Sequence, residues 1–230
     1  RAYLRRANLR DAELSGANLH RADLRMAELE AANFHRANLE GIEIEGPELR
    51  GARLDETTQM DDRWRLIWEI FNQRVVGRDL SWVNLSETNL SGVNLSHTDL
   101  TRADLSGTNL THANLDAATL IGANLSKANL AEVNLGGTDL SGADLRGANL
   151  QQANLYMAAL NDADVRGVDL SGVNLKGSDL NDANLSESKL IAADLARANL
   201  RGANFYQADL MEADLSGANL GGACFSGAKI

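Results

Sequence analysis

The sequence has little of the material from which most protein cores and disulfide frameworks are built. Aromatic residues make up 4% of its 230 residues, so any core must consist mainly of Leu and Ala. A single cysteine, Cys224, excludes an internal disulfide framework and leaves the redox compartment undecided. No apolar run approaches the roughly 18 residues needed to span a bilayer, and no secretory signal peptide is visible.

The charge balance narrows the classes of partner. A net charge of −10 disfavours nonspecific binding to nucleic acid or to an anionic membrane, and it favours basic partners. The chain begins with Arg1 rather than Met, so we expect that its start has been processed or trimmed. We expect a cytoplasmic protein, with the periplasm or the thylakoid lumen as alternatives if a targeting segment has been removed.

What the sequence does have is a tandem repeat of five residues. From Leu80 to Ile230, all 31 positions at this spacing hold Leu, Phe, Val or Ile, and each is called a centre below. The residue two before a centre is small or β-branched in every case but Arg78, and Asn or Asp directly precedes 26 of the 31 centres. Residues 2–54 repeat the pattern with 11 further centres, which gives the consensus A-(D/N)-L-x-x.

A period of five fits neither an α-helix nor a long flat strand. An α-helix would spread the centres around its whole surface, and a strand would turn alternate centres to opposite faces. A short extended piece followed by a turn, when repeated, places each centre and the small residue two before it on the same side. The Asn or Asp between them then points the other way.

Glycine indicates where the turn lies. Of the 20 glycines, 17 stand two residues after a centre, as in Leu140-Ser141-Gly142-Ala143. That is the third position of a four-residue turn that begins at the centre, and a type II turn needs a positive φ there. If each turn redirects the chain by about a right angle, four repeats close one square coil, and successive coils stack about 4.8 Å apart.

Tandem A-(D/N)-L-x-x units resemble the pentapeptide-repeat family over about nine-tenths of the chain. The resemblance implies an all-β fold, a right-handed quadrilateral β-helix. By the count of centres, this solenoid has about ten coils here, and one α-helical insertion interrupts it.

The insertion is predicted where residues 55–77 break the repeat. Leu54 and Leu80 are 26 residues apart, which is five repeats plus one, so the two blocks are out of frame and a segment must loop out. We therefore predict a first repeat block at 1–54, a helical insertion at 55–77 and a second repeat block at 78–230, together one solenoid domain.

Apolar residues recur at helical spacing within the insertion and predict an α-helix at about 60–73. They are Met60, Trp64, Ile67, Trp68 and Phe71. Asp61 and Asp62 suit a helix N-terminus, and Thr58 is a candidate cap. The segment DDRWRLIWEIFNQ is similar to insertions in bacterial, especially cyanobacterial, pentapeptide-repeat proteins.

So short a helix must bury its aromatic stripe against something. It packs on the outer wall of its own solenoid or covers the end of a coil, or it docks a partner protein, or it associates with a second copy. For docking, the predicted contact residues are Trp64, Trp68, Phe71 and Trp82, and the alternation of side chains directs Trp82 outward.

No pattern for catalysis or metal binding is present. The histidines stand at the variable positions after centres, where exposure is expected; they are His20, His35, His97 and His112. The signatures of P-loops, zinc proteases, nucleophile elbows and CxxC redox sites are absent. Asn and Asp alternate freely before the centres, so wall geometry rather than catalysis explains the acids. We predict no enzyme, no cofactor and no metal.

Two functions remain open. The first is a non-catalytic protein–protein interaction or scaffold module, which presents a rigid β-helical rod to an unknown, basic protein partner. A further contact expected for such a module is homodimerisation through an uncapped solenoid end. The alternative is an acidic DNA mimic that binds a topoisomerase such as DNA gyrase, as some members of the resembled family do. The eighteen acidic and ten basic residues of 78–230 give a net charge far sparser than the roughly one charge per 1.7 Å of duplex DNA, which ranks this alternative second.

Overall fold

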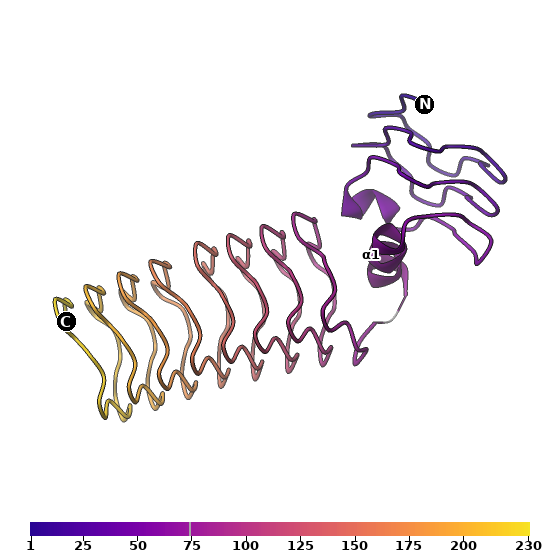
Figure 1. Cartoon of the computed structure of the whole chain (residues 1–230). Helices are drawn as coiled ribbons and strands as arrows, with labels where there is room; N and C mark the ends of the chain where they lie inside the picture. Colours follow the sequence, from indigo (N-terminus) through magenta and orange to yellow (C-terminus); the bar gives the residue numbers. More distant parts are fainter. Residues whose placement is uncertain (74) are drawn as a thin grey trace. The chain divides into compact units, whose positions relative to one another are not determined.

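The computed structural model describes residues 1–73 and 75–230, with the backbone alone for residues 46 and 47. The chain winds into coils that stack on one another (Figure 1). Parallel bridges join residues 20 positions apart, as between Tyr3 and Asp23 or between Asn84 and Asp104. Four pentapeptides therefore make one coil, as the repeat predicts.

The chain divides into two compact units, Arg1–Val75 and Val76–Ile230. The helices of the described residues both lie in the first unit: the 3₁₀ helix η1 (Gly46–Leu49) and the α-helix α1 (Asp62–Asn72). The predicted insertion at 55–77 includes residue 74, which lies outside the described residues.

Each coil is bonded to both of its neighbours through the backbone. The N–H of Leu100 donates to the carbonyl of Thr119 at 2.7 Å, and the N–H of Asp99 donates to the carbonyl of Arg78 at 3.0 Å. Between these ladders the centres point inward, and in the middle coils of the second unit they are completely buried, as Leu120 and Leu140 are. The narrow interior accepts only small residues beside them, which explains the repeated Ala.

The turns follow the predicted geometry but use more residue types than glycine. The N–H of Ala103 donates to the carbonyl of Leu100 at 2.9 Å, and Arg102, at the third position, has a φ of 56°. Of the 17 glycines at this position, 16 have positive φ, and Gly46 lies in η1 instead; among the described residues, 23 of other types also have positive φ. A left-handed residue without glycine is held there by ladder bonds on both sides, as when Arg102 donates its N–H to Ile121 at 2.8 Å.

The Asn or Asp before each centre caps the turn that follows. The Oδ1 of Asp79 accepts the N–H of Ser81 at 2.9 Å, and this contact recurs from coil to coil. An asparagine also donates its Nδ2 to the same position one coil earlier, as Asn154 does to Asn134 at 3.1 Å. One such column continues through Asn94, Asn114, Asn134, Asn154 and Asn174.

In the first unit the coil continues past its predicted end at residue 54. Asn38 pairs with Gln59, 21 residues ahead, so one extra residue is absorbed without leaving the ladder. The Asp55 carboxylate folds the extra residue in by accepting the N–H of Thr58 at 3.0 Å. Thr58 is therefore buried inside the coil and donates its hydroxyl to the carbonyl of Phe34 at 2.9 Å, so its prediction as a helix cap was wrong.

Candidate functional site

The helix α1 starts one turn after this irregular coil, at Asp62, and ends at Asn72. Asp61, at its N-cap, makes no side-chain bond to the helix. Its carboxylate instead accepts the N–H of Gly41, a turn residue one coil earlier, at 2.8 Å. The helix is therefore placed by the coil beside it, and it falls within the predicted range of about 60–73.

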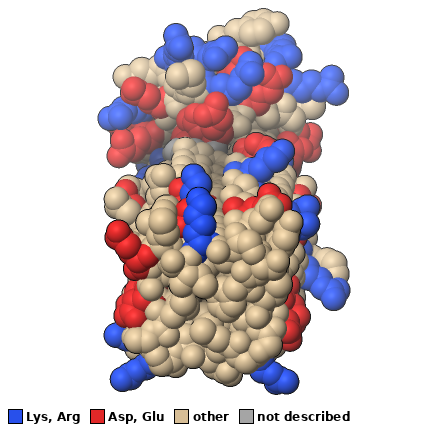
Figure 2. Space-filling model, turned by 90° about the vertical axis from the view of Figure 1, so that its left-hand side faces the viewer, with Lys and Arg blue, Asp and Glu red and all other residues tan. Residues whose placement is uncertain are grey.

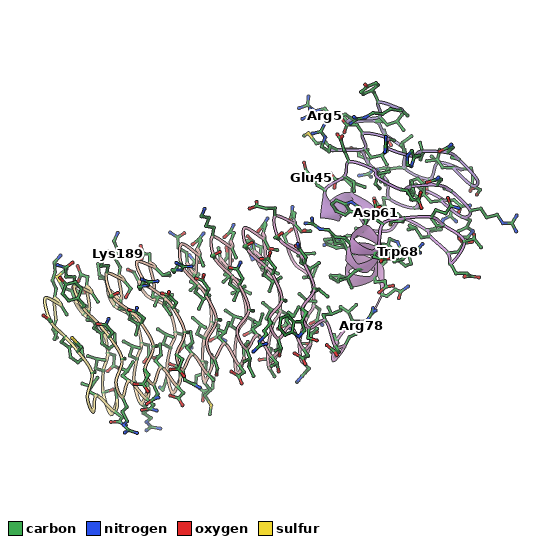
Figure 3. The ribbon with its side chains drawn as sticks, in the orientation of Figure 1. Arg5, Glu45, Asp61, Trp68, Arg78 and Lys189 are labelled. Atoms are coloured by element: carbon green, nitrogen blue, oxygen red, sulfur yellow. The ribbon has the colours of Figure 1, made fainter. Side chains whose placement is uncertain are left out.

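Three side chains of α1 bind the backbone of the coil that precedes the helix. Arg65 donates to the carbonyls of Asp55, at 2.9 Å, and of Thr58. The indole N–H of Trp68 donates to the carbonyl of Ala52 at 2.7 Å (Figure 3). Asn72 completes the set, since its Nδ2 donates to the carbonyl of Leu49 at 2.8 Å and its Oδ1 accepts the N–H of Gly51 at 2.6 Å.

The predicted docking residues of α1 lie half-buried. The Arg63 guanidinium stands 5.6 Å from the ring centre of Trp64, and the Arg50 guanidinium stands 5.0 Å from that of Phe71. The side chains that α1 buries completely or nearly so are Ile67 and Ile70. The predicted stripe contained Ile67 but missed Ile70, because its aromatic residues flank the buried face instead of forming it.

Trp82, the fourth predicted docking residue, belongs to the second unit. It is 67% exposed, in agreement with its predicted outward direction. Its φ of 61° is that of the third turn position, and the Arg102 guanidinium one coil later lies 4.8 Å from its ring centre. The backbone ladder holds the main chain of Trp82, and this cation–π contact favours one orientation of its solvent-facing ring.

Apart from the centres Leu220 and Ile230 of its last coil, five other large apolar side chains of the second unit are also exposed. They are Ile121, Tyr156, Met157, Tyr206 and Met211. All of them occupy the two variable positions after a centre, and this placement is the sequence signal that would have identified them. The second unit therefore exposes several large apolar side chains at the turns of its hydrogen-bonded coils.

The acidic residues of the second unit are partly neutralised where they stand one above another. Arg146 pairs with Asp144 at 2.6 Å and lies 3.6 Å from Asp164, and Arg166 pairs with Asp164 at 2.6 Å. The hydrogen bond from Arg146 holds the pKa of Asp144 below its ordinary value, and Arg166 does the same for Asp164. Carboxylates with lowered pKa values stay ionised at neutral pH and are poor general acids.

One histidine–glutamate pair and the cysteine lie at the surface of the second unit. His112 lies 3.3 Å from Glu132, with both side chains largely exposed, and Cys224 is exposed as a free thiol. Within residues 1–73 and 75–230, His, Cys, Asp and Glu form no group of three or more that could hold a metal ion. In the same residues no helix has the length and apolarity to cross a membrane.

A cavity of about 410 Å³ lies in the first unit beside η1. Its lining includes Met26, Leu29 and Glu48. The Glu48 carboxylate accepts the N–H of Met26 at 3.0 Å through Oε1, while its buried Oε2 has no hydrogen-bond partner. Burial raises the pKa of this carboxyl above its ordinary value, because removal from water disfavours the ionised form.

Solved structures with similarity to the chain are pentapeptide-repeat proteins. HetL, involved in heterocyst differentiation regulation in the cyanobacterium Nostoc sp. strain PCC 7120, is 28% identical, with 98% of this chain and 89% of HetL covered and a TM-score of 0.32. QnrB1, a plasmid-mediated fluoroquinolone resistance protein, is 17% identical, with 90% and 88% covered and a TM-score of 0.49. The Nostoc protein alr5209 is 36% identical, with 44% and 83% covered and a TM-score of 0.25.

No curated protein matches the chain. The family model for pentapeptide repeats matches it in eight copies, which cover residues 2–41, 79–116, 108–147, 128–167, 158–195 and 193–230. These stretches include both stacks of coils and make up well over half of the sequence. The chain belongs to the pentapeptide-repeat family.

Proposed function

We propose that the protein is a non-catalytic protein-binding module, each of whose units is a right-handed quadrilateral β-helix with partner-contacting side chains on its outer walls. The single observation that carries the proposal is Trp82, which stays 67% exposed while its ring is in cation–π contact with Arg102. A large aromatic residue that is held rigidly before binding loses little freedom in a complex, and such residues dominate interface energies.

The predicted contact residues take different parts in this proposal. Trp82 is the primary anchor, because it has the largest exposed fraction of the four. Trp64 and Phe71 offer only the edges that their arginine neighbours leave open. Trp68 acts mainly through its bond to Ala52, so its substitution would disturb the coil as well as any partner.

The charge of the second unit favours a basic partner. Residues 78–230 carry eighteen acidic and ten basic residues, so the walls around Trp82 attract positively charged surfaces. The ion pairs of Arg146 and Arg166 interrupt the acidic columns, however, and keep the surface from presenting an unbroken row of negative charge.

A photo-crosslinking amino acid in place of Trp82 tests the proposal directly. In extracts of the source cells, we expect a discrete covalent adduct that unlabelled wild-type protein competes away and that Trp82→Ala protein competes away less well. Tyr156→Ala protein is the matched control, since Tyr156 is an exposed aromatic residue elsewhere on the second unit. Equal competition by all three proteins would remove Trp82 from the binding surface.

The DNA-mimic reading is a second candidate, favoured by the acidic excess of residues 78–230. In that reading the chain binds a topoisomerase such as DNA gyrase in place of duplex DNA. A supercoiling assay separates the two candidates. Inhibition of gyrase by the wild-type protein, retained in Trp82→Ala but lost when acidic wall residues are neutralised, would place this candidate first.

A further inference from the structure

The last coil of the first unit has an edge that no further coil of this unit continues. Within the stack, a turn N–H commonly donates to a backbone carbonyl of the next coil, as that of Gly16 does to His35 at 2.8 Å. At the end of the first unit, side chains take over this role. Asp61 accepts the N–H of Gly41, and Asn72 accepts the N–H of Gly51.

The carbonyls on the same edge are satisfied in the same way. Those of Leu49, Ala52, Asp55 and Thr58 accept hydrogen bonds from the side chains of Asn72, Trp68 and Arg65. A single helix of eleven residues, together with the residue before it, thus pairs both backbone N–H groups and backbone carbonyls along one coil edge. An edge with unpaired N–H and C=O groups would be a template for adding another strand.

We propose that α1 is an edge guard: a cap that keeps this coil edge from pairing with a coil of a second copy of the same chain. The edge is complementary to a pentapeptide coil because the parallel ladder with a 20-residue register is what the other described coils form with one another. A second copy carries the same register and the same inward Leu and Ala, so it fits this edge better than a chain without the repeat.

The guard is attached to the coil mainly by polar side chains. Of the residues of α1, only Ile67 and Ile70 are buried, and a helix of this length is marginal in isolation. The coil itself keeps its bridges to the preceding coil, such as Asn33 with Arg53 and Asn38 with Gln59, whether or not α1 is bound. Loss of the side-chain bonds therefore uncovers the edge while the coil remains formed.

The test uses the full chain with the double substitution Arg65→Ala and Asn72→Ala. These changes remove the bonds to Leu49, Asp55, Thr58 and the Gly51 N–H but leave the bond from Gly41 to Asp61 untouched. Hydrogen exchange of the Gly41 amide therefore reports whether α1 has moved from the edge. Sedimentation over a wide range of protein concentration reports self-association.

We expect faster exchange at Gly41 together with reversible, concentration-dependent association in the double variant. Gln73→Ala is the control, because Gln73 is exposed and donates to the carbonyl of Glu69 through its backbone N–H; it should match the wild type in both measurements. Faster exchange without association would overturn the proposal, and so would unchanged exchange. If the double variant fails to fold, Trp68→Phe decides, since it removes only the bond to Ala52 and should give the same two changes at smaller size.

Discussion

The two units use the same repeat but stabilise their walls differently. In the second unit, amide side chains stack in columns, as from Asn94 to Asn174, and each amide binds both its own turn and the preceding coil. In the first unit, the corresponding wall contacts are mostly ion pairs, such as Arg25 with Asp23 and Arg53 with Glu13. In the first unit, the side chains of α1 also bind the edge of the last coil.

This difference shows that the repeat fixes the interior more strictly than the wall. Both units place Leu and Ala inside, whereas the position before the centre varies: it is mostly Asn or Asp, whose oxygen accepts the following turn N–H, but it also holds Glu13, Ala159 and Lys189. Ion pairs are weakened by salt and acid, and amide columns are not. The first unit should therefore respond more strongly than the second to pH and to ionic strength.

The last coil of the second unit provides a contrast within a single stack. The last coil leaves Leu220 38% exposed and Ile230 79% exposed, while Phe225 stacks on Phe205 at 4.9 Å between ring centres. In Figure 2 this end is largely free of charged side chains, which gather along the sides. A side chain at an interior position therefore contributes less to the free energy of unfolding here than in the middle of the stack.

The largest expected effect is the loss of an interior leucine. Leu125→Ala should lower the free energy of unfolding of the second unit by about 2–5 kcal/mol, because Leu125 is fully buried and leaves a cavity. Leu220→Ala should lower it clearly less, because Leu220 is 38% exposed. Denaturant titration followed by far-UV circular dichroism measures both, and equal losses would mean that burial within the stack does not set stability.

A smaller effect is expected at two equivalent threonines, one in each unit. Thr108→Val removes the bond to the carbonyl of Leu85, at 2.9 Å, and should cost about 1 kcal/mol. Thr58→Val removes the same kind of bond to Phe34 and also frees Asp55, which folds in the extra residue, so its cost should be larger, about 1–3 kcal/mol. Hydrogen exchange in each unit gives the two values, and the reverse order would contradict the role given to Asp55.

The pH response of the first unit depends on Asp23. The hydrogen bond from Arg25 lowers the pKa of Asp23 from 3.8 to about 2, so its contribution to stability is complete above pH 3.8 and is lost as the pH falls through about 2. Arg25→Ala should move this loss to higher pH. Carboxyl NMR titration of Asp23 measures the pKa, with Arg53→Ala as the control because Arg53 pairs with Glu13. An unchanged pKa in Arg25→Ala would contradict the assignment.

Glu48 should give a smaller effect of opposite sign. Because burial raises its pKa, its contribution to the stability of the first unit is complete below the ordinary carboxyl pKa of 4.5 and is lost as the pH rises through the raised value. Glu48→Gln should remove this loss and leave the first unit no less stable at neutral pH. Thermal unfolding at several pH values measures it, and an identical pH dependence in the variant would show that Glu48 is not the group involved.

Much of the fold could be predicted from the sequence because the repeat determines local contacts. The centres from Leu80 to Ile230 were assigned to the interior, and Gly142 to the third turn position. The 23 turn residues with positive φ that are not glycine stand two residues after a centre, so the period marks their place although their residue types do not. Ile70 was missed because the aromatic residues of α1 obscured the buried face.

The candidate site was predictable in part. Trp82 was predicted to face outward and does so. Trp64, Trp68 and Phe71 were predicted as a docking stripe, and the structure places them half-buried at the edges of α1. No sequence pattern shows that Trp68 and Asn72 bind carbonyls of a coil, because those partners lie 16 and 23 residues earlier and depend on the path of the chain between them.

The sequence by itself determined the coil: a five-residue period with one large and one small apolar residue has a single way to bury both on the same side, and four such units close a turn. Only the tertiary structure decided how the coils of the first unit end. The extra residue between Leu54 and Gln59 could have shifted the ladder or been absorbed, and the choice depended on Asp55 reaching Thr58 and on α1 reaching the free edge. Hydrogen bonds between groups far apart in the chain carry no periodic signal, so they appear only once the chain is folded.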